Sequence, residues 1–204
     1  MNFKSTRELV EYTKKYIKGK TLDFGAGNAK YKNIIKPRTS EYITFDVVPG
    51  KNIDVVGNAL NSPFQDESFD TVVSTQVLEH VEKPWLMIKE IGRILKRGGV
   101  CILSAPFMVP YHADPNDYFR YTKNGLMSLF KNESFEVLEC ESYGKIFTVF
   151  SEMFRFSFLN PYSGKEFKGK QRLVKILNNI SGYLDQLSKS KIAYPNVFIV
   201  AKKK

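Results

Sequence analysis

The chain has 204 residues, of which 43% are hydrophobic and 25% are charged, a composition typical of a globular protein with one large domain or two small ones. It excludes a disordered chain, a collagen-like fibre and a disulfide-rich scaffold. No apolar run is typical of a secretion signal or approaches the roughly 20 residues that span a membrane. Because two cysteines favour a reducing compartment, we expect a cytoplasmic protein.

The net charge of +10 is unevenly distributed. Residues 1–35 carry eight Lys or Arg against three Asp or Glu (+5), residues 36–142 carry eleven against fifteen (−4), and residues 143–204 carry twelve against three (+9). A basic head and tail around a mildly acidic middle suggest an anionic partner, meaning nucleic acid, acidic lipid or a phosphorylated substrate. The alternative is that the charge serves solubility alone.

Strand and helix signals alternate along the chain. Ser5-x-x-Glu8 is a capping box that predicts an N-terminal helix, with Gly19 as its end. Runs of β-branched and aromatic residues predict seven strands, at residues 21–24, 41–47, 53–56, 69–74, 100–105, 135–141 and 197–201. With helices between most of these strands, the pattern predicts an open α/β sheet that is covered on both faces.

Two later helices have clear start signals. Pro84 suits the first turn of a helix that we expect to end at the Gly98-Gly99 pair. Its expected apolar stripe consists of Trp85, Ile88, Ile91 and Leu95. Thr122 is the expected cap of a second helix, which extends through Phe130.

A glycine-rich turn, LDFGAGN at residues 22–28, joins a predicted strand to a predicted helix. Its glycines let the backbone approach a ligand closely. Asp46 ends the second strand, where an acid can accept hydrogen bonds from both ribose hydroxyls. Asp23 and the absence of a third glycine disfavour a pyrophosphate, and with it a nicotinamide dehydrogenase. A ligand with a ribose, an ammonium group and no phosphate fits better, and S-adenosylmethionine is such a ligand.

Residues 21–107 resemble the class I S-adenosylmethionine-dependent methyltransferases, through the turn at 22–28 and a nearly continuous run of later motifs at 57–107. The resemblance implies a Rossmann-like seven-stranded sheet. The helical spacing of apolar residues within residues 143–193 adds a helical insertion before the last strand. The resemblance further implies S-adenosyl-L-methionine as cofactor and S-adenosyl-L-homocysteine as product. The expected single domain, 1–204, comprises an N-terminal helix (1–20), a cofactor-binding core (21–142), a helical insertion (143–193) and a last strand with a basic tail (194–204).

The resemblance also assigns cofactor contacts. Asp23 and the backbone around Gly25 and Gly27 would hold the methionine moiety. Asp46 would bind the ribose hydroxyls. Taken singly, the glycines could serve turn geometry alone and Asp46 could be a helix cap, but the ordered set favours a cofactor.

The remaining assigned contacts follow the third and fourth strands. Asn58 and Ala59 fall at the adenine position, where the asparagine replaces the family's usual acid but can still accept a hydrogen bond. Gln76 and Val77 would line the sulfonium and substrate face. His80, which follows them, is expected to be structural.

The loop at residues 106–122 follows the fifth strand, where open α/β sheets bind ligands. With the next few residues it resembles methyltransferases of bacterial glycan and lipopolysaccharide biosynthesis, through His112, Pro115, Asp117, Arg120, Thr122, Gly125 and Leu126. His112 is the predicted base for a hydroxyl acceptor. Asp117 would orient His112 or bind a sugar hydroxyl, and Arg120 would pair with an acidic substrate group. The alternative is that Asp117 and Arg120 pair to close the loop.

The insertion leaves two interpretations open. It contains five phenylalanines at residues 147–158 and then a stripe at helical spacing, namely Leu173, Ile176, Leu177, Ile180, Leu184 and Leu187. Aromatic and basic side chains together suit an anionic membrane surface. We favour instead a lid over the acceptor site, with the apolar stripe packed on the sheet.

Cys101 and Cys140 fall in the fifth and sixth predicted strands. The family's strand order would separate them by about two strand spacings, too far for a disulfide, so we expect buried thiols and no metal site. The predicted activity is methyl transfer from S-adenosylmethionine to an oxygen, or less favourably a nitrogen, of a small molecule or glycan intermediate. The alternatives are an RNA methyltransferase, for which no recognised RNA-binding module is present, and a catalytically degenerate partner subunit.

Overall fold

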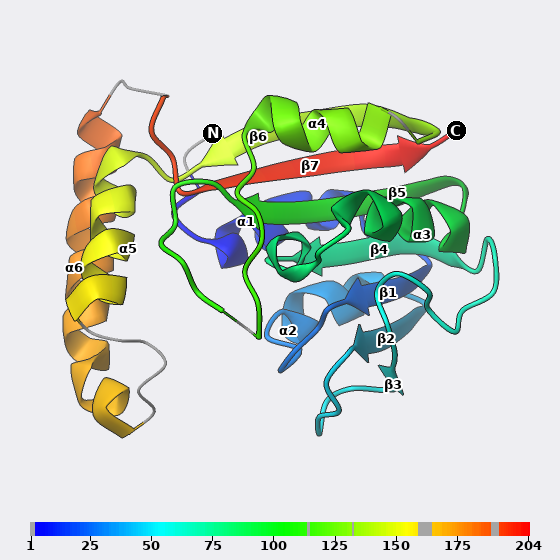
Figure 1. Ribbon diagram of the computed structural model, residues 1–204, viewed down its shortest axis with the longest axis horizontal. Helices are drawn as coiled ribbons and strands as arrows, with labels where there is room; N and C mark the ends of the chain where they lie inside the picture. The colour runs from blue at the N-terminus through cyan, green and yellow to red at the C-terminus, as the bar shows by residue number, and fades with distance from the viewer. Residues whose placement is uncertain (1–2, 114, 132, 159–164, 189–191) are drawn as a thin grey trace.

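The computed structural model describes residues 3–113, 115–131, 133–158, 165–188 and 192–204, with the backbone alone over 165–171. These residues form one seven-stranded sheet in the order β3-β2-β1-β4-β5-β7-β6. The strands are β1 (Lys20–Phe24), β2 (Glu41–Asp46), β3 (Val55–Val56), β4 (Phe69–Thr75), β5 (Leu95–Pro106), β6 (Phe135–Tyr143) and β7 (Asn196–Lys203). Only β7 runs antiparallel to its neighbours, β5 and β6 (Figure 1). The predicted α/β sheet is confirmed.

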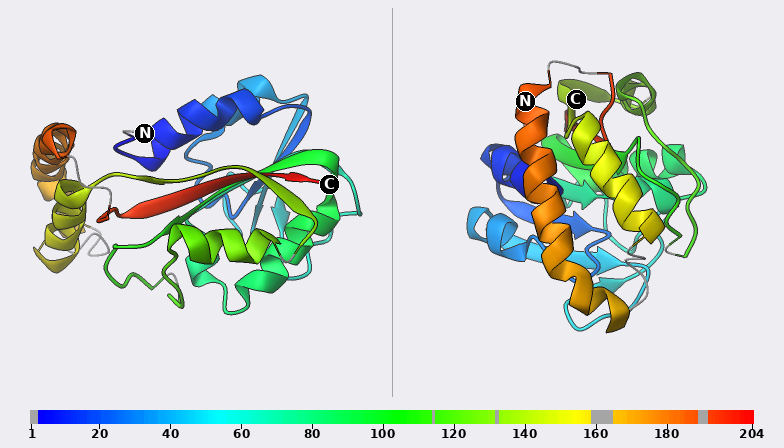
Figure 2. Two further views of the ribbon diagram at one scale, coloured as in Figure 1. Left: turned by 90° about the horizontal axis from the view of Figure 1, so that it is seen from above. Right: turned by 90° about the vertical axis from the view of Figure 1, so that its left-hand side faces the viewer.

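Helices cover both faces of the sheet (Figure 2). α1 (Thr6–Thr13) and α2 (Lys32–Ile35) lie on one face, and α3 (Pro84–Ile94) and α4 (Lys123–Lys131) lie on the other. Because side chains alternate along a strand, β5 contributes to both cores. Its Cys101 and Leu103 pack with α3 and α4, whereas Ile102 packs with α1 and α2.

The two predicted helix caps are present. The Ser5 hydroxyl accepts a hydrogen bond from the Glu8 amide (3.3 Å), and the Glu8 carboxylate accepts one from the Lys4 amide (3.0 Å). The Thr122 hydroxyl accepts a hydrogen bond from the Gly125 amide (3.0 Å). Each cap satisfies backbone donors that the first helical turn leaves without partners.

The predicted end of α3 was wrong, and so was one residue of its predicted apolar face, whereas Ile88 and Ile91 are buried as expected. The helix ends at Ile94, and Leu95 adopts an extended conformation, pairs with Phe69 and begins β5. Trp85 is 51% exposed. The fully buried side chains of the helix are Met87, Ile88, Ile91 and Ile94. The helical periodicity continues through Leu95, but sheet pairing buries this residue in a strand instead.

Two helices, α5 (Ile146–Phe158) and α6 (Lys165–Leu187), occupy the segment between β6 and β7. They pack on each other as a hairpin beyond the carboxyl ends of the parallel strands (Figure 1). Asp185 of α6 joins them, because its carboxylate accepts hydrogen bonds from the amides of Lys145 (3.0 Å) and Phe147 (2.9 Å) at the start of α5. The predicted helical insertion is therefore present.

The apolar stripe of α6 does not pack on the sheet, contrary to our expectation. Leu173, Ile176, Ile180 and Leu187 are exposed, and so are Phe150, Met153, Phe154 and Phe158 of α5. The polar side chains of α6 face α5 instead, since Asp185 is buried at the α5 N-terminus and Asn178 accepts a hydrogen bond from Ser151 (3.2 Å). These polar contacts turn the stripe toward solvent.

Cys101 and Cys140 are free, and β7 separates their strands. Cys101 is buried as expected, whereas Cys140 is only half-buried. In the part of the chain that the structure describes, every helix is too short or too polar to cross a membrane.

Candidate active site

The turn after β1 brings its backbone close to neighbouring elements. Gly25 has φ +77°, and a Cβ at this position would lie 2.3 Å from the Val77 side chain. The amides of Gly25 and Ala26 donate to the Phe45 carbonyl (2.8 and 3.0 Å). Only glycine combines this left-handed conformation with the close approach, so the sequence requires the residue for the shape of the turn.

A cavity of about 440 Å³, which we call the cofactor cavity, lies beside this turn. Its walls include six of the residues assigned to the cofactor, namely Gly25, Gly27, Asp46, Ala59, Gln76 and Val77. The Asp46 carboxylate accepts hydrogen bonds from the amides of Gly27 (2.8 Å) and Val48 (3.0 Å), which fix it at the rim. Each of its oxygens retains a lone pair for a ligand hydroxyl.

Two assigned residues lie outside the cavity walls. Asn58 uses its side-chain oxygen to accept a hydrogen bond from the Leu60 amide (2.8 Å). Asp23 is buried under the turn, where its carboxylate accepts a hydrogen bond from the Tyr42 hydroxyl (2.6 Å). Burial outweighs this hydrogen bond and raises the pKa of Asp23 to about 6. The direct contacts of Asp23 and Asn58 with a cofactor stay predictions.

A second cavity of about 480 Å³, which we call the acceptor cleft, lies between α1, the end of β4 and the α5–α6 hairpin. Its walls carry four basic side chains, from Lys4, Arg7, Lys30 and Arg155, and one acidic side chain, from Glu152. Glu152 pairs with Arg155. Among the described residues, no acid forms an ion pair with the other three. The cleft therefore has a positive potential.

Gln76 lines both cavities. Its φ of +56° is unusual for a residue other than glycine, and its side-chain amide lies within hydrogen-bond distance of the hydroxyls of Ser104 (3.2 Å) and Tyr143 (3.4 Å). A residue held in this conformation at a cavity wall is typical of a functional site. The sequence analysis placed Gln76 at the boundary between cofactor and substrate, and the two cavities meet there.

The pair of Asp117 and Arg120 shapes the loop that carries His112. Arg120 forms an ion pair with Asp117 and donates to the carbonyls of Val109 and Pro110 (both 2.8 Å). The Asp117 carboxylate also accepts a hydrogen bond from the His112 amide (2.7 Å). Burial raises the pKa of Asp117, but Arg120 and His112 outweigh it and lower the pKa. Of the two interpretations of this pair, the geometry favours the one that closes the loop and positions His112.

His112 lies beside Glu79 and His80, which belong to the 3-10 turn Leu78–His80 after β4. The Nε2 atoms of His80 and His112 each lie 3.8 Å from Oε1 of Glu79, which is fully buried. Burial lowers the pKa of His112, but Glu79, the Pro110 carbonyl and Asp117 outweigh it, so the pKa of His112 is raised. His112 lines the acceptor cleft and His80 lines the cofactor cavity.

The sequence analysis missed Glu79. Its backbone carbonyl accepts a hydrogen bond from the Tyr118 amide (2.8 Å), so the turn also anchors the His112 loop. One sequence feature could have indicated its importance. Glu79 is an acid next to His80, and both residues closely follow β4, the strand that leads to Gln76 and Val77 of the predicted cofactor site.

Comparisons with known proteins agree with this geometry. Residues 22–103 match the family model described as a methyltransferase domain. The uncharacterized protein MJ1123 of Methanocaldococcus jannaschii is 32% identical over 99 residues, which cover 46% of this chain and 48% of that protein. The uncharacterized methyltransferase Rv0224c of Mycobacterium tuberculosis is 43% identical over 56 residues, 28% of this chain and 21% of that protein.

The match thus spans less than half the length of these curated relatives. Among solved structures, a putative methyltransferase (BH2331) of Bacillus halodurans has a TM-score of 0.63 at 18% identity, over 98% of this chain and 99% of that one. This similarity extends the shared fold well beyond residues 22–103. Residues 22–103 therefore match a methyltransferase domain, and the sheet order and the structural similarity show that the described chain has the fold of the class I methyltransferases.

Proposed function

We propose that this protein transfers a methyl group from S-adenosylmethionine to a hydroxyl oxygen of an anionic small molecule or glycan intermediate. The observation that carries the proposal is that the cofactor cavity and the acceptor cleft share Gln76. Two ligands bound on its two sides would meet at this residue. Methyl transfer requires such a meeting because the acceptor atom must lie in line with the methyl carbon.

The residues of the cofactor cavity suit S-adenosylmethionine. Any side chain at Gly25 would collide with Val77, so the close approach of backbone there is built into the turn. The Asp46 carboxylate at the rim suits a pair of ribose hydroxyls. The cavity walls carry no Lys or Arg among the described residues, so the site suits a cofactor without phosphate groups better than a dinucleotide.

The acceptor cleft favours an acceptor that carries phosphate or carboxylate. Lys4, Arg7 and Lys30 would pair with such groups. The hairpin closes the far side of the cleft through side chains of both helices, including Arg155 and Ser181. This position supports a lid that excludes water from the reaction.

S-adenosylmethionine supplies a methyl carbon that the sulfonium already activates, so the protein's main tasks are alignment and water exclusion. A hydroxyl acceptor must also lose its proton. The cluster of Glu79, His80 and His112 lies between the two cavities, where its side chains are placed to assist this step. Asp117 and Arg120 act as positioning residues, since they hold the loop that carries His112.

The first test is calorimetric titration of S-adenosylmethionine and S-adenosylhomocysteine. We expect binding that weakens by about 10- to 100-fold in Asp46→Ala, since the variant loses charge-assisted hydrogen bonds. Transfer is then assayed with labelled cofactor on matched neutral and phosphorylated sugars, sugar nucleotides and RNA. His112→Ala should cut transfer about 10²-fold or more while cofactor affinity persists. Methylation of RNA alone would favour the RNA methyltransferase, and binding without any transfer would favour a partner subunit.

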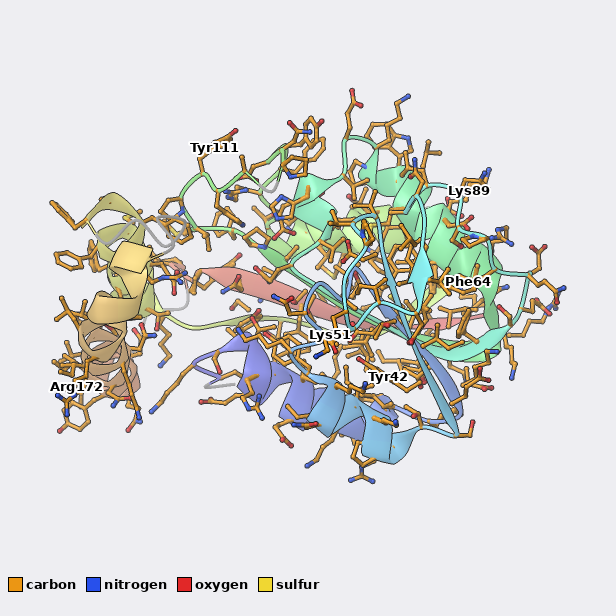
Figure 3. All side chains as sticks on the ribbon, turned by 90° about the horizontal axis from the view of Figure 1, so that it is seen from below. Tyr42, Lys51, Phe64, Lys89, Tyr111 and Arg172 are labelled. Atoms are coloured by element: carbon orange, nitrogen blue, oxygen red, sulfur yellow. The ribbon has the colours of Figure 1, made fainter. Side chains whose placement is uncertain are left out.

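We also propose that the hairpin contacts an anionic membrane surface. Its outer face carries exposed apolar side chains from both helices, and Arg172 and Lys175 are exposed on the same helix as Ile176 and Ile180. Figure 3 shows Arg172 at the end of the molecule far from Lys89 of α3. Apolar and basic groups together are complementary to an acidic lipid surface, and such a contact would bring a lipid-linked acceptor to the cleft.

A further inference from the structure

Glu79 is an unusual carboxylate in this fold. Among the described residues it is the only one with both carboxylate oxygens buried and without a hydrogen-bond partner. Burying an ionised carboxylate is unfavourable unless a positive charge or a set of donors compensates for the lost water. The side chains that Glu79 faces are the two imidazoles of His80 and His112.

Backbone contacts fix the tautomers of both imidazoles. Nδ1 of His80 lies 2.6 Å from the Asn116 carbonyl, and Nδ1 of His112 lies 2.9 Å from the Pro110 carbonyl. A carbonyl only accepts, so each Nδ1 carries the hydrogen. Arg120 Nη2 also lies 3.3 Å from His112 Nδ1, but its two hydrogens point to Pro110 (2.8 Å) and Asp117 (2.6 Å).

In the neutral imidazoles, both Nε2 atoms therefore present lone pairs toward Glu79. One ring nitrogen of each histidine and a Glu79 carboxylate oxygen lie within 4.8 Å of one another. None of the three can donate to another, and one carries a negative charge. Three converging lone pairs in a buried setting are satisfied by a cation or by a shared proton at their centre.

We propose that Glu79, His80 and His112 form a binding site for a divalent transition-metal ion. Two imidazoles and one carboxylate suit Zn²⁺ or Mn²⁺ better than Mg²⁺, which prefers oxygen ligands. Ligands about 2.0–2.2 Å from one ion lie roughly 3–3.5 Å apart. The two 3.8 Å separations between histidine and Glu79 need a small contraction, and a separation of up to 4.8 Å within the cluster needs a larger one. The Nδ1 contacts with backbone carbonyls are the typical outer contacts of metal-bound histidines.

The site bridges the two cavities, because His80 lines one and His112 lines the other. Three protein ligands leave coordination positions open for an acceptor hydroxyl and water. This role rests on the proposed methyl transfer. The bound hydroxyl releases its proton to solvent and its oxygen stays on the ion. That oxygen's electron pair then forms the bond to the methyl carbon, the carbon–sulfur bond breaks, and its electron pair remains on sulfur. His112 acts as a ligand here, rather than as the base predicted from the sequence.

The sequence analysis predicted no metal site, because both cysteines were expected to be buried in the core. The proposed ligands come from two separate segments, residues 79–80 and residue 112. Only the folded chain, in which the loop after β5 lies against the turn after β4, brings them together.

The test measures metal binding directly. Protein freed of metal by a chelator is titrated calorimetrically with Zn²⁺, Mn²⁺ and Mg²⁺, and its bound metal is measured by elemental analysis. We expect one equivalent of Zn²⁺ or Mn²⁺ and at least about tenfold weaker binding in His80→Ala and His112→Ala. Cobalt substitution adds a spectroscopic readout that reports histidine ligation, and these are the chain's only two histidines. Glu82→Gln, an exposed acid in the same segment, is the matched control and should bind as the parent does.

Glu79→Gln should also lose the metal, and its cofactor titration shows whether the variant is folded. Absence of Zn²⁺ and Mn²⁺ binding in a protein that binds S-adenosylmethionine would overturn the metal site, leave the methyl transfer standing, and favour a proton shared among the three side chains. Metal binding that survives both histidine variants would overturn the ligand assignment. One bound equivalent with no methyl transfer to any acceptor would support the site and contradict the proposed function instead.

Discussion

Gly25 and Val77 are in direct contact across the wall of the cofactor cavity, and there is no room for a Cβ between them. Gly25→Ala would therefore displace the turn or Val77, and its φ of +77° adds strain. We expect S-adenosylmethionine affinity to fall at least tenfold, together with a loss of about 1–3 kcal/mol in the free energy of unfolding. Calorimetric titration and urea denaturation measure the two effects.

Gly27→Ala is the matched control for that change. Gly27 also has a positive φ, but its Cβ would meet no atom within 4 Å. Only the conformational cost of about 1 kcal/mol should appear in its unfolding free energy. Equal destabilisation by both substitutions would contradict the role assigned to Val77.

The second prediction concerns Asp23, whose pKa burial raises to about 6. Between pH 4 and 6 the unfolded chain releases this proton while the folded protein keeps it, so stability falls as pH rises. Asp23→Asn cannot ionise, so its stability should not fall as pH rises through this range. At pH 7–8 its free energy of unfolding should exceed that of the parent by about 1–3 kcal/mol. Urea denaturation from pH 4 to 8, without cofactor, measures the difference. If the difference in stability between Asp23→Asn and the parent does not change with pH, the buried carboxyl is not its cause. Asp66→Asn, at an exposed position, provides the control.

The third prediction tests the charge of the acceptor cleft. Arg7→Ala should raise KM for a phosphorylated or carboxylated acceptor about tenfold, which corresponds to about 1.4 kcal/mol, and leave cofactor affinity unchanged. Initial-rate kinetics with a matched neutral acceptor provide the comparison. Lys89→Ala, which removes an exposed charge on α3 (Figure 3), should have no effect. An equal rise in KM for the neutral acceptor would rule out charge recognition by Arg7.

The fourth prediction concerns the junction of α5 and α6. Asp185→Ala removes the carboxylate that accepts hydrogen bonds from the Lys145 and Phe147 amides. Loss of such a cap costs about 0.5–2 kcal/mol, so limited proteolysis should cut the hairpin faster than in the parent. KM for the acceptor should rise, because α5 and α6 wall the cleft. Asp185→Asn keeps one acceptor oxygen and should show a smaller effect, and unchanged proteolysis in both variants would show that this contact does not hold the hairpin.

The fifth prediction concerns the exposed face of the hairpin. The protein should sediment with vesicles that contain phosphatidylglycerol and not with purely zwitterionic ones, and salt should weaken the association. Ile176→Asp with Ile180→Asp should abolish it, since both side chains are exposed on α6. The alternative is that this face contacts the α5–α6 hairpin of a second copy of the chain. A concentration-dependent dimer that the same double variant disrupts, with no vesicle binding, would replace the membrane proposal.

The features that the sequence predicted correctly depend on local patterns. The strands are short apolar runs between breaks. Gly25 and Gly27 belong to the turn after β1, and Asp46 ends the next strand, β2. Such features need only a few neighbouring residues to be recognised. They were sufficient to predict the sheet and six of the residues that line the cofactor cavity.

The failures involve contacts between distant residues. Leu95 extends the helical periodicity of α3, but its pairing with Phe69 makes it a strand residue. The apolar spacing of α6 predicted a buried face. The Asp185 carboxylate instead accepts hydrogen bonds at the N-terminus of α5, and this contact turns the apolar stripe toward solvent. The sequence gives no sign that Glu79 lies beside His112, because the two residues are far apart along the chain.

The two cavities draw on different stretches of the chain. All the cofactor cavity residues except Pro115 lie between Phe24 and Val81, inside the segment that matches the methyltransferase domain. The acceptor cleft takes only Lys30, Tyr31 and Gln76 from that segment and the rest of its walls from residues before and after it. Substitutions outside residues 22–103 can thus reshape the acceptor cleft while nearly all of the cofactor cavity wall stays as it is.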